Sequence, residues 1–450
     1  MRVGALSLFG SVTLPTGLPA SQDPSATHHG TAKSVILLNL FGGPPHIDMF
    51  DMKPDAPTNV RGEFKPIETS LTGLQISELL PLTAQVMDRL TLIRTYSHKY
   101  NSHNPYNVLT GFDGGSDREN YFAKRSDHPG MGAVCQYLDL GSKNVPRYVT
   151  MPAYPGWSQG IRRAGPYGGY LGSQYDPLTT VCSPKFSKKG EFYKPVIPDG
   201  QPLLPSLDQL PQVTADRLDR RHSLLEQIDD GLASLEQTRA TESMTKFQEQ
   251  VFNLLTSPKT RQAFDLSQET GASRDLYGRN LWGNSMLVAR RLVEAGSTFV
   301  TVNWEEADSG NHWDMHNNTF GMQKVLVPAL DRMISGIILD LEERSLLDRT
   351  LVVIMGEMGR TPKVNSRAGR DHWPQCGFAL LAGGGIKQGV VLGKTDKHAA
   401  YPVERPVSAG DMVATIYQQI GVNPSLTIDD LSGRPVPISH GGKPMWEVIA

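Results

Sequence analysis

The chain has 450 residues, of which 39% are hydrophobic and 20% charged, and its formal net charge is −2. This length fits one large α/β domain or two ordinary domains. Because 44 basic residues stand against 46 acidic ones, no basic excess exists to bind nucleic-acid phosphates or anionic membranes, and we expect no nucleic-acid partner. Three isolated cysteines, Cys135, Cys182 and Cys376, allow at most one disulfide and are interpreted as buried thiols.

The first 32 residues have the pattern of an export signal followed by a linker. Residues 1–20 read MRVGALSLFGSVTLPTGLPA, with one Arg, a short apolar run broken by Gly and Pro, and then small residues. A membrane span needs about 20 apolar residues, and no other stretch of the chain is long enough. We therefore expect an exported protein, periplasmic or extracellular, whose mature chain has no transmembrane span and whose main domain covers 33–450.

The first half of that domain alternates apolar runs with loops. Residues 34–41 (SVILLNLF) predict a buried parallel strand that ends in a Gly-Gly-Pro-Pro turn. Residues 73–98 predict an amphipathic helix and then a strand that ends near Tyr96, and residues 104–111 predict a helix stopped by Gly. Residues 112–200 are rich in Gly, Pro, Tyr and Ser, which indicates a large loop-rich insertion of the kind that covers a site.

The second half shows clearer periodicity. Residues 206–265 predict one or two charged surface helices. Residues 280–304 predict a helix, a Gly turn and a strand, residues 325–348 a helix, and residues 350–357 a strand, with short strands at 378–382 and 390–392. Alternation of this kind is typical of an α/β fold with a mostly parallel central sheet and helices on both faces.

Polar residues gather where the predicted strands end, which is where such sheets carry functional groups. The stretch LLNLFGGPPHIDMFD follows the first strand and offers Asn39, His46, Asp48 and Asp51. It can supply ligands, or it can be an ordinary turn in which the Asp side chains cap loop amides.

The stretch SHKYNSHNP enters the helix at 104–111 and contains His98, Ser102 and His103. A hydroxyl at a helix start meets unpaired amides that suit an oxyanion or a phosphate-like group. The same residue can serve simply as the helix N-cap.

Two later stretches carry Asp, Glu and His. NHWDMHNN follows the strand TFVTVNW, and Asp314 and His316 point to one side if the backbone there is extended. Glu357 ends a buried strand, where a carboxylate needs a cation, a donor or a metal, so Arg360 could be its ion-pair partner. His372 could be a ligand with Asp371 as its hydrogen-bond acceptor.

The order of these groups is similar to that of the alkaline phosphatase and sulfatase superfamily. More closely, the chain resembles exported bacterial proteins grouped as domain of unknown function family 1501. The closer resemblance rests on GGPPHIDMFD at 42–51, WDMH at 313–316, GEMGRTP at 356–362 and GRDHW at 369–373, and it extends over residues 30–445. Members commonly begin with a twin-arginine export signal, whose tail resembles residues 2–20, although the Arg-Arg pair itself is missing here.

The resemblance implies an alkaline-phosphatase-like domain and a role for each matching position. Asn39 stands where the superfamily has an Asp ligand, so Asp48 is expected to supply that ligand from the following loop, with Asp51 as the other option. Ser102 matches the nucleophile, and no Cys is present there to become formylglycine, which disfavours a sulfatase of the usual kind. His103 or His98 would transfer protons.

The other implied positions are an anion clamp at Arg360 and metal ligands at Asp48, Asp314, His316, Glu357 and His372. One metal site is then complete and a second is incomplete. A mixed carboxylate and imidazole set favours Zn²⁺ or Mn²⁺ over Ca²⁺ or Mg²⁺.

Three functions stay open at this point. The first is a metal-dependent hydrolase of phosphate or sulfate esters, with a small-molecule or polysaccharide ester as substrate. The second is a non-catalytic relative that binds a ligand or polysaccharide. The third is a structural or partner-binding protein whose polar clusters satisfy one another. The sequence fixes neither the substrate nor the oligomeric state.

Overall fold

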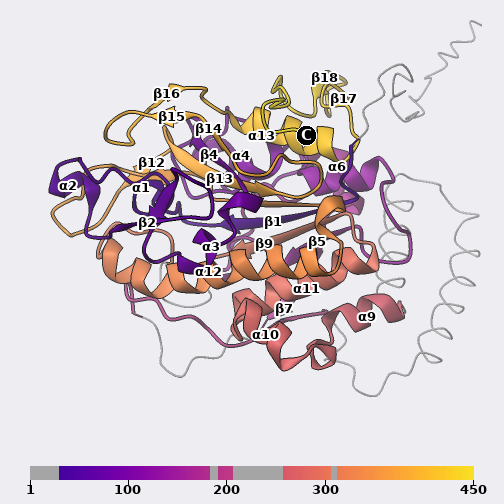
Figure 1. The fold of residues 1–450 in the computed structure, drawn as a ribbon. Coiled ribbons are helices and arrows are strands. Elements are labelled where there is room, and N and C mark those ends of the chain that lie inside the picture. Colours follow the sequence, from indigo (N-terminus) through magenta and orange to yellow (C-terminus); the bar gives the residue numbers. More distant parts are fainter. Residues whose placement is uncertain (1–29, 183–190, 206–256, 306–311) are drawn as a thin grey trace, which may run out of the picture.

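In the computed structural model, residues 30–182, 191–205, 257–305 and 312–450 are described (Figure 1). The proposed export signal and most of the predicted charged helices of 206–265 lie outside these ranges. Among the described residues, no helix is both long enough and apolar enough to cross a bilayer.

The centre of the molecule is an eight-stranded sheet with the strand order β14-β4-β13-β10-β1-β9-β5-β6. Its members are β14 (Val390–Leu392), β4 (Thr91–Tyr96), β13 (Gly377–Ala382), β10 (Thr350–Met355), β1 (Ser34–Leu40), β9 (Phe299–Trp304), β5 (Tyr148–Met151) and β6 (Leu178–Thr179). Only β13 runs against its neighbours, β10 and β4, and the other pairings are parallel. The predicted α/β fold with a mostly parallel sheet is thereby confirmed.

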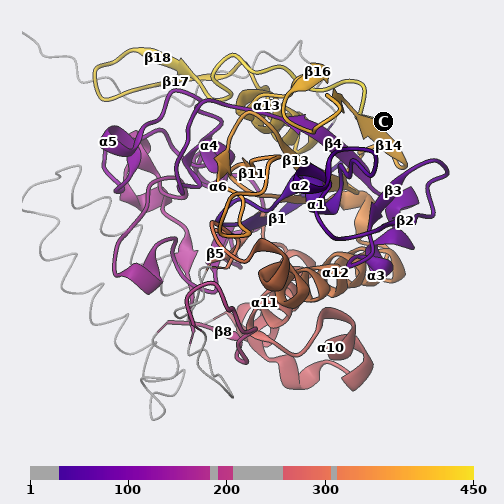
Figure 2. The same ribbon diagram turned by 90° about the vertical axis from the view of Figure 1, so that its left-hand side faces the viewer.

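Helices cover both faces of this sheet (Figures 1 and 2). One face carries α11 (Leu281–Ala295) and α12 (Thr319–Glu343), with α9 (Pro258–Phe264) and α10 (Gly271–Tyr277) beyond them and α3 (Pro81–Ala84) beside α12. The other face carries α13 (Ala409–Gln419), α6 (Met131–Tyr137) and α4 (Tyr106–Thr110). Strand β1 is buried on both sides, which explains its continuous apolar run.

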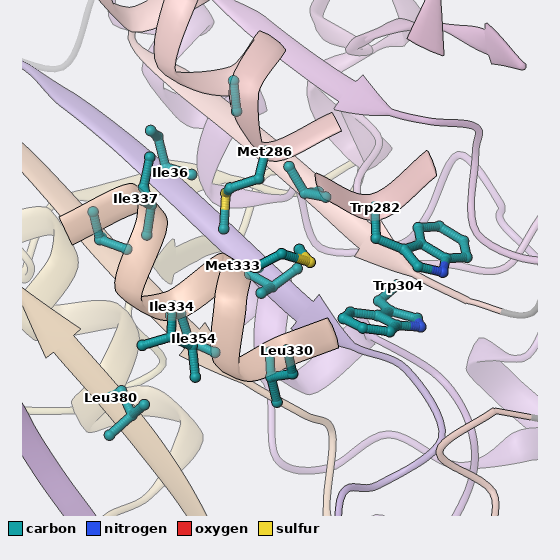
Figure 3. Packing of buried hydrophobic residues seen from close by; sticks show 14 of the residues in the cluster. Ile36, Trp282, Met286, Trp304, Leu330, Met333, Ile334, Ile337, Ile354 and Leu380 are labelled. Atoms are coloured by element: carbon teal, nitrogen blue, oxygen red, sulfur yellow. The ribbon is translucent and has the colours of Figure 1, made fainter. Parts of the chain in front are cut away.

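The core on the α11/α12 face shows why these helices form where they do. Helix α11 is capped at its N-terminus by Asn280, whose side chain accepts the backbone N–H groups of residues 282 and 283, and at its C-terminus by Gly296 with a φ of +112°. Its Trp282 stacks on Trp304 from the end of β9, with ring centroids 5.6 Å apart, and Met286 packs further along the sheet (Figure 3).

Two stretches differ from their sequence predictions. Residues 73–98 form no long amphipathic helix but β3 (Gln75–Ser77), the single turn α3 and then β4, because β3 pairs with β2 (Pro66–Glu68) in a small hairpin. Proline at the first position of α3 also separates that turn from the residues before it. The loop-rich stretch 112–200 supplies β5, β6 and α6 to the main body, so it is partly integral to the sheet.

The remaining α-helices and β-strands are short. They are α1 (His46–Met49), α2 (Thr58–Arg61), α5 (Asp117–Asn120), β7 (Val181–Cys182), β8 (Pro202–Leu203), β11 (Gly359–Arg360), β12 (His372–Trp373), β15 (Lys394–Thr395), β16 (Pro402–Glu404), β17 (Thr427–Asp429) and β18 (Pro435–Pro437). Of these, the β11–β12 ribbon follows β10 and pairs Arg360 with His372. All three cysteines are free thiols; Cys135 and Cys376 are buried, whereas Cys182 is only half-buried.

Candidate metal centre

Four side chains from three distant stretches meet beyond the ends of β4, β9 and β10. His103, Asp314, His316 and His372 each offer one ligand atom, and these atoms all lie within 4.8 Å of one another. The Nε2 atoms of His103 and His316 are each 3.0 Å from Asp314 Oδ1, and Nε2 of His372 is 3.5 Å from it. We call these four residues the His3Asp group.

The ring of His103 is oriented by a buried carboxylate. Its Nδ1 lies 2.8 Å from Glu357 Oε1. Because a carboxylate accepts, Nδ1–H is the donor, and Nε2 carries the lone pair when the ring is neutral. Nε2 is itself buried and faces Asp314 Oδ1 at 3.0 Å. A buried imidazole nitrogen held in this way is ready to accept a metal ion.

His316 repeats the same arrangement. Its Nδ1 is 2.7 Å from Asp371 Oδ1, and its Nε2 is 3.0 Å from Nε2 of His372. The sequence had suggested Asp371 as the partner of the adjacent His372; in the structure it orients His316. Side chains alternate between the two faces of an extended strand, so Asp371 and its neighbour His372 at the start of β12 point to opposite sides.

The pKa values of the four side chains are shifted by burial and by contacts with their charged neighbours. Burial lowers the pKa of His103, but the contacts with Asp314 and Glu357 outweigh burial and raise it. The contact with Asp314 also raises the pKa of His316, against burial. Burial lowers the pKa of His372 despite the nearby Asp314. Burial would raise the pKa of Asp314, yet the three histidines hold it below its usual range.

This donor set fits a divalent ion of the zinc type. Imidazole nitrogen and carboxylate oxygen are both ligand types that Zn²⁺ takes, whereas Ca²⁺ and Mg²⁺ are held mainly by oxygen. Two of the imidazoles already have carboxylates behind them, as metal-ligating histidines usually do. The residues present therefore suit the metal that the sequence suggested.

Glu357 lies behind this group rather than inside it. It follows β10, is fully buried, and accepts the backbone N–H of Gly42 at 2.8 Å and 3.1 Å in addition to the His103 proton. The alternative in which Glu357 pairs with Arg360 is not what the structure shows. Arg360 instead lies 2.7 Å from Asp314 Oδ1.

Arg360 is fully buried, and its guanidinium is largely occupied. It donates to the carbonyls of Gly42, Gly43 and Arg370 as well as to Asp314. An anion clamp needs free N–H groups facing the ligand. The geometry favours a different use, in which Arg360 offsets the charge of Asp314 and ties the Gly42–Gly43 turn to β11.

Asp48 lies apart from the His3Asp group. Its two carboxylate oxygens accept the guanidinium of Arg370 at 2.7 Å and 2.8 Å, and Gln323 donates to it at 2.9 Å. Asp48 and Arg370 are both fully buried. Asp51, the other option from this loop, contacts Lys53 at 2.9 Å and Arg94 at 3.5 Å. The loop after β1 thus supplies ion pairs that hold the fold.

The other predicted catalytic residues flank His103. Ser102 immediately precedes it and is buried, and it lies outside α4, whose N-cap is Pro105. Both ring nitrogens of His98 contact backbone: Nε2 contacts the carbonyl of Glu357, and Nδ1 accepts from the N–H of Tyr100 at 3.2 Å. His98 is thus held by backbone contacts at both ring nitrogens, and burial lowers its pKa.

The sequence analysis had pointed to all four residues of this group but not to the residues that hold His103 in place. It suggested Asp314, His316 and His372 as ligands and His103 as a proton carrier, and the structure brings all four together. It gave no sign that Arg163 reaches the backbone of His103 or that Phe41 lies against its ring, at 5.9 Å between centroids. Both contacts join residues far apart in the chain, which no local pattern reveals.

The fold and this group define a protein with a large, mostly parallel α/β sheet and a histidine-rich metal-type site at its carboxyl edge. Residues 32–449 match the family model described as protein of unknown function DUF1501, so the chain belongs to that family. No curated protein matches the sequence.

Three similar solved structures show how far the likeness extends. Ps i-CgsB is 11% identical, with a TM-score of 0.42 over 92% of this chain and 76% of that one. The phosphonate monoester hydrolase SpPMH from Silicibacter pomeroyi is 11% identical, with a TM-score of 0.38 over 92% and 78%. The lipoteichoic acid synthase LtaP from Listeria monocytogenes is 10% identical, with a TM-score of 0.37 over 94% and 79%. At these identities and TM-scores we infer nothing about function from the likeness, and we rely on this chain's own residues.

Proposed function

We propose that this protein is a metal-dependent hydrolase of phosphate or sulfate esters that acts in the cell envelope. The observation that carries the proposal is the His3Asp group, in which two imidazoles are oriented by buried or half-buried carboxylates. His103, Asp314, His316 and His372 would hold one divalent ion, with Zn²⁺ or Mn²⁺ preferred. Such an ion supplies Lewis-acid stabilisation of negative charge on an ester oxygen.

The residues around the group suggest how the chain would use that charge. We assign Ser102 as the nucleophile because it adjoins His103 in the chain. Its Oγ would lose its proton and form a bond to phosphorus or sulfur while the bond to the leaving alkoxide breaks and that alkoxide takes up the proton. Water would then hydrolyse the seryl ester and restore the Ser102 hydroxyl. Glu357 holds the His103 ring in place throughout. The substrate would be a small-molecule or polysaccharide ester.

A second candidate is a non-catalytic ligand-binding or polysaccharide-binding protein. It is favoured by the absence of a carboxylate at the end of β1, where Asn39 donates to Asn303 Oδ1 at 3.3 Å. With a single carboxylate among its four donors, the His3Asp group could serve to recognise a ligand rather than to turn it over.

The first experiment measures bound metal by mass spectrometry in the protein purified without chelators. We expect about one ion per chain in the wild type and loss of it in the His316→Ala/His372→Ala double variant. His398→Ala, which changes a histidine outside the group, is the matched control and should keep its ion. Absence of metal in the wild type after incubation with Zn²⁺, Mn²⁺, Mg²⁺ and Ca²⁺ would refute the proposal.

The second experiment separates the two candidates. The loaded protein is assayed on p-nitrophenyl phosphate and p-nitrophenyl sulfate, beside Ser102→Ala. Hydrolysis that disappears with the Ser102 hydroxyl supports the hydrolase. Tight metal binding without any turnover of either ester favours the binding protein, and full activity of Ser102→Ala would show that another group attacks.

Export is a separate proposal that rests on residues 1–32. Fractionation of the producing cells, followed by determination of the mature N-terminus, tests it. We expect the protein in the periplasm or medium, cleaved near the small residues around position 20. Recovery of the uncleaved chain from the cytoplasm would contradict export.

A further inference from the structure

Arg163 is a buried cation that reaches the proposed metal site from the loop-rich stretch 112–200. Only 2% of it is exposed, and among the described residues it has no acidic partner. Its Nη1 donates to the backbone carbonyl of His103 at 2.7 Å, and its Nη2 donates to Gln159 Oε1 at 2.6 Å. Its Nε is buried without a hydrogen-bond partner.

Two aromatic rings enclose the guanidinium. Its Cζ lies 4.6 Å from the centroid of Tyr121 and 5.1 Å from that of Phe41. Phe41 is also the ring that lies against the imidazole of His103. Arg163 therefore holds His103 in two ways, directly through its carbonyl and indirectly through Phe41.

The loop that carries Arg163 is itself anchored to the sheet. Gly156 donates its N–H to both carboxylate oxygens of Glu305, at 2.9 Å and 2.7 Å, and Glu305 directly follows β9. The loop closes on itself because the N–H of Arg163 donates to Pro155 O at 3.0 Å. The backbone of Arg163 is thus held by contacts that do not involve His103.

This arrangement is costly as a purely structural device. A buried guanidinium without a carboxylate loses hydration that cation–π contacts and neutral acceptors recover only in part. An apolar side chain of similar length at this position would not carry that desolvation cost. What Arg163 provides in return is a fixed backbone at His103, in a segment between β4 and α4 that has no regular secondary structure.

We propose that Arg163 is a positioning residue for the metal site, which holds His103 so that its Nε2 faces Asp314, His316 and His372. The inference rests on the metal site proposed above. Ligand atoms must be held to within about half an ångström for tight binding. The stretch 112–200 thereby becomes a determinant of metal affinity although it contributes no ligand itself.

The test compares Arg163→Met with the wild type in two measurements. Metal affinity is measured by competition with a chromogenic chelator, and stability is measured by denaturant unfolding of the metal-free proteins. We expect Arg163→Met to bind the ion 10-fold to 100-fold more weakly, as for loss of a partner that orients a ligand, with unfolding midpoint unchanged or raised. The Co²⁺-substituted variant should also show an altered visible absorption spectrum.

Three further proteins complete the design. Arg163→Lys keeps the charge and should recover part of the affinity. Arg162→Met is the matched control, because Arg162 lies over Tyr167 at 4.2 Å and near Asp176 but does not touch His103. Gln159→Met removes the outer hydrogen bond of Arg163 and should weaken binding less than Arg163→Met.

The outcomes separate the two levels of the argument. If the wild type binds an ion and Arg163→Met binds it equally well, Arg163 has only a structural role and the inference is overturned. If Arg163→Met loses affinity only in proportion to a loss of stability, the inference is also overturned. If the wild type binds no ion, the proposed function fails. The inference is then decided by NMR of the metal-free proteins, in which the chemical shifts of the His103 ring nitrogens must differ between wild type and Arg163→Met.

Discussion

Glu357→Gln is the substitution that tests the candidate centre most directly, because it preserves shape and removes charge. Glu357 is fully buried, and its Oε1 accepts from His103 Nδ1 and from the Gly42 N–H, each at 2.8 Å. A Gln can place its carbonyl oxygen at the same point and keep both hydrogen bonds. His103 then stays oriented, but the negative charge beside its Nδ1 is gone, and that charge is what makes Nε2 more basic.

The expected size of the effect follows from what is kept and what is lost. Removing a partner of a metal-ligating histidine typically costs 10-fold to 100-fold in affinity. Because Glu357→Gln retains the hydrogen bond, we expect the lower end, about 10-fold, or roughly 1.4 kcal/mol. Glu357→Ala should cost more and should also destabilise the fold, because the buried N–H of Gly42 is left unpaired, at about 1–3 kcal/mol.

The assay is chelator competition for Zn²⁺ at neutral pH, with denaturant unfolding as a parallel measurement. Asp371→Asn is the matched control on the other oriented imidazole, His316. About half of the Asp371 side chain is exposed (49%), so solvent screens its charge and its effect should be smaller than that of Glu357→Gln. Equal affinities for wild type and Glu357→Gln would refute the view that a buried carboxylate tunes this site.

Three other predictions follow from the same contacts. Because the pKa values of His103 and His316 are raised, protons compete with the ion: affinity should rise with pH until both imidazoles are neutral, and calorimetry in buffers of different ionisation enthalpy should detect proton release. Asp48→Asn should lower the free energy of unfolding by about 3–5 kcal/mol, because it leaves Arg370 buried and unpaired, while metal affinity measured on the folded protein stays unchanged; a specific loss of affinity would place Asp48 at the metal. Burial lowers the pKa of His440 to about 3, so the stability linked to its neutral form is present above pH 6.5 and is lost as the pH falls. At pH 5 that loss is about 2 kcal/mol. Between pH 7 and pH 5 the free energy of unfolding should therefore fall by about 2 kcal/mol less in His440→Asn than in the wild type.

Local patterns were sufficient where secondary structure is decided by nearby residues. The apolar run of β1, the capped helix α11 and the alternation of helix and strand after residue 280 appear in the structure as predicted. They succeed because burial on both faces and helix capping leave a signature within a few residues. The same reasoning failed at residues 73–89, where pairing of β3 with β2 overrode the helical periodicity.

The sequence by itself determined the class of fold and the residue types at the candidate centre. Asp314, His316 and His372 could be named because strand ends in a parallel sheet gather at one edge. Only the tertiary structure decided which acids join them. Asp48 forms an ion pair with Arg370, Glu357 accepts a hydrogen bond from His103, and Asp371 contacts His316. The physical reason is that a buried carboxylate is stabilised by whichever cation or donor lies within hydrogen-bond distance, and that partner comes from a distant part of the chain.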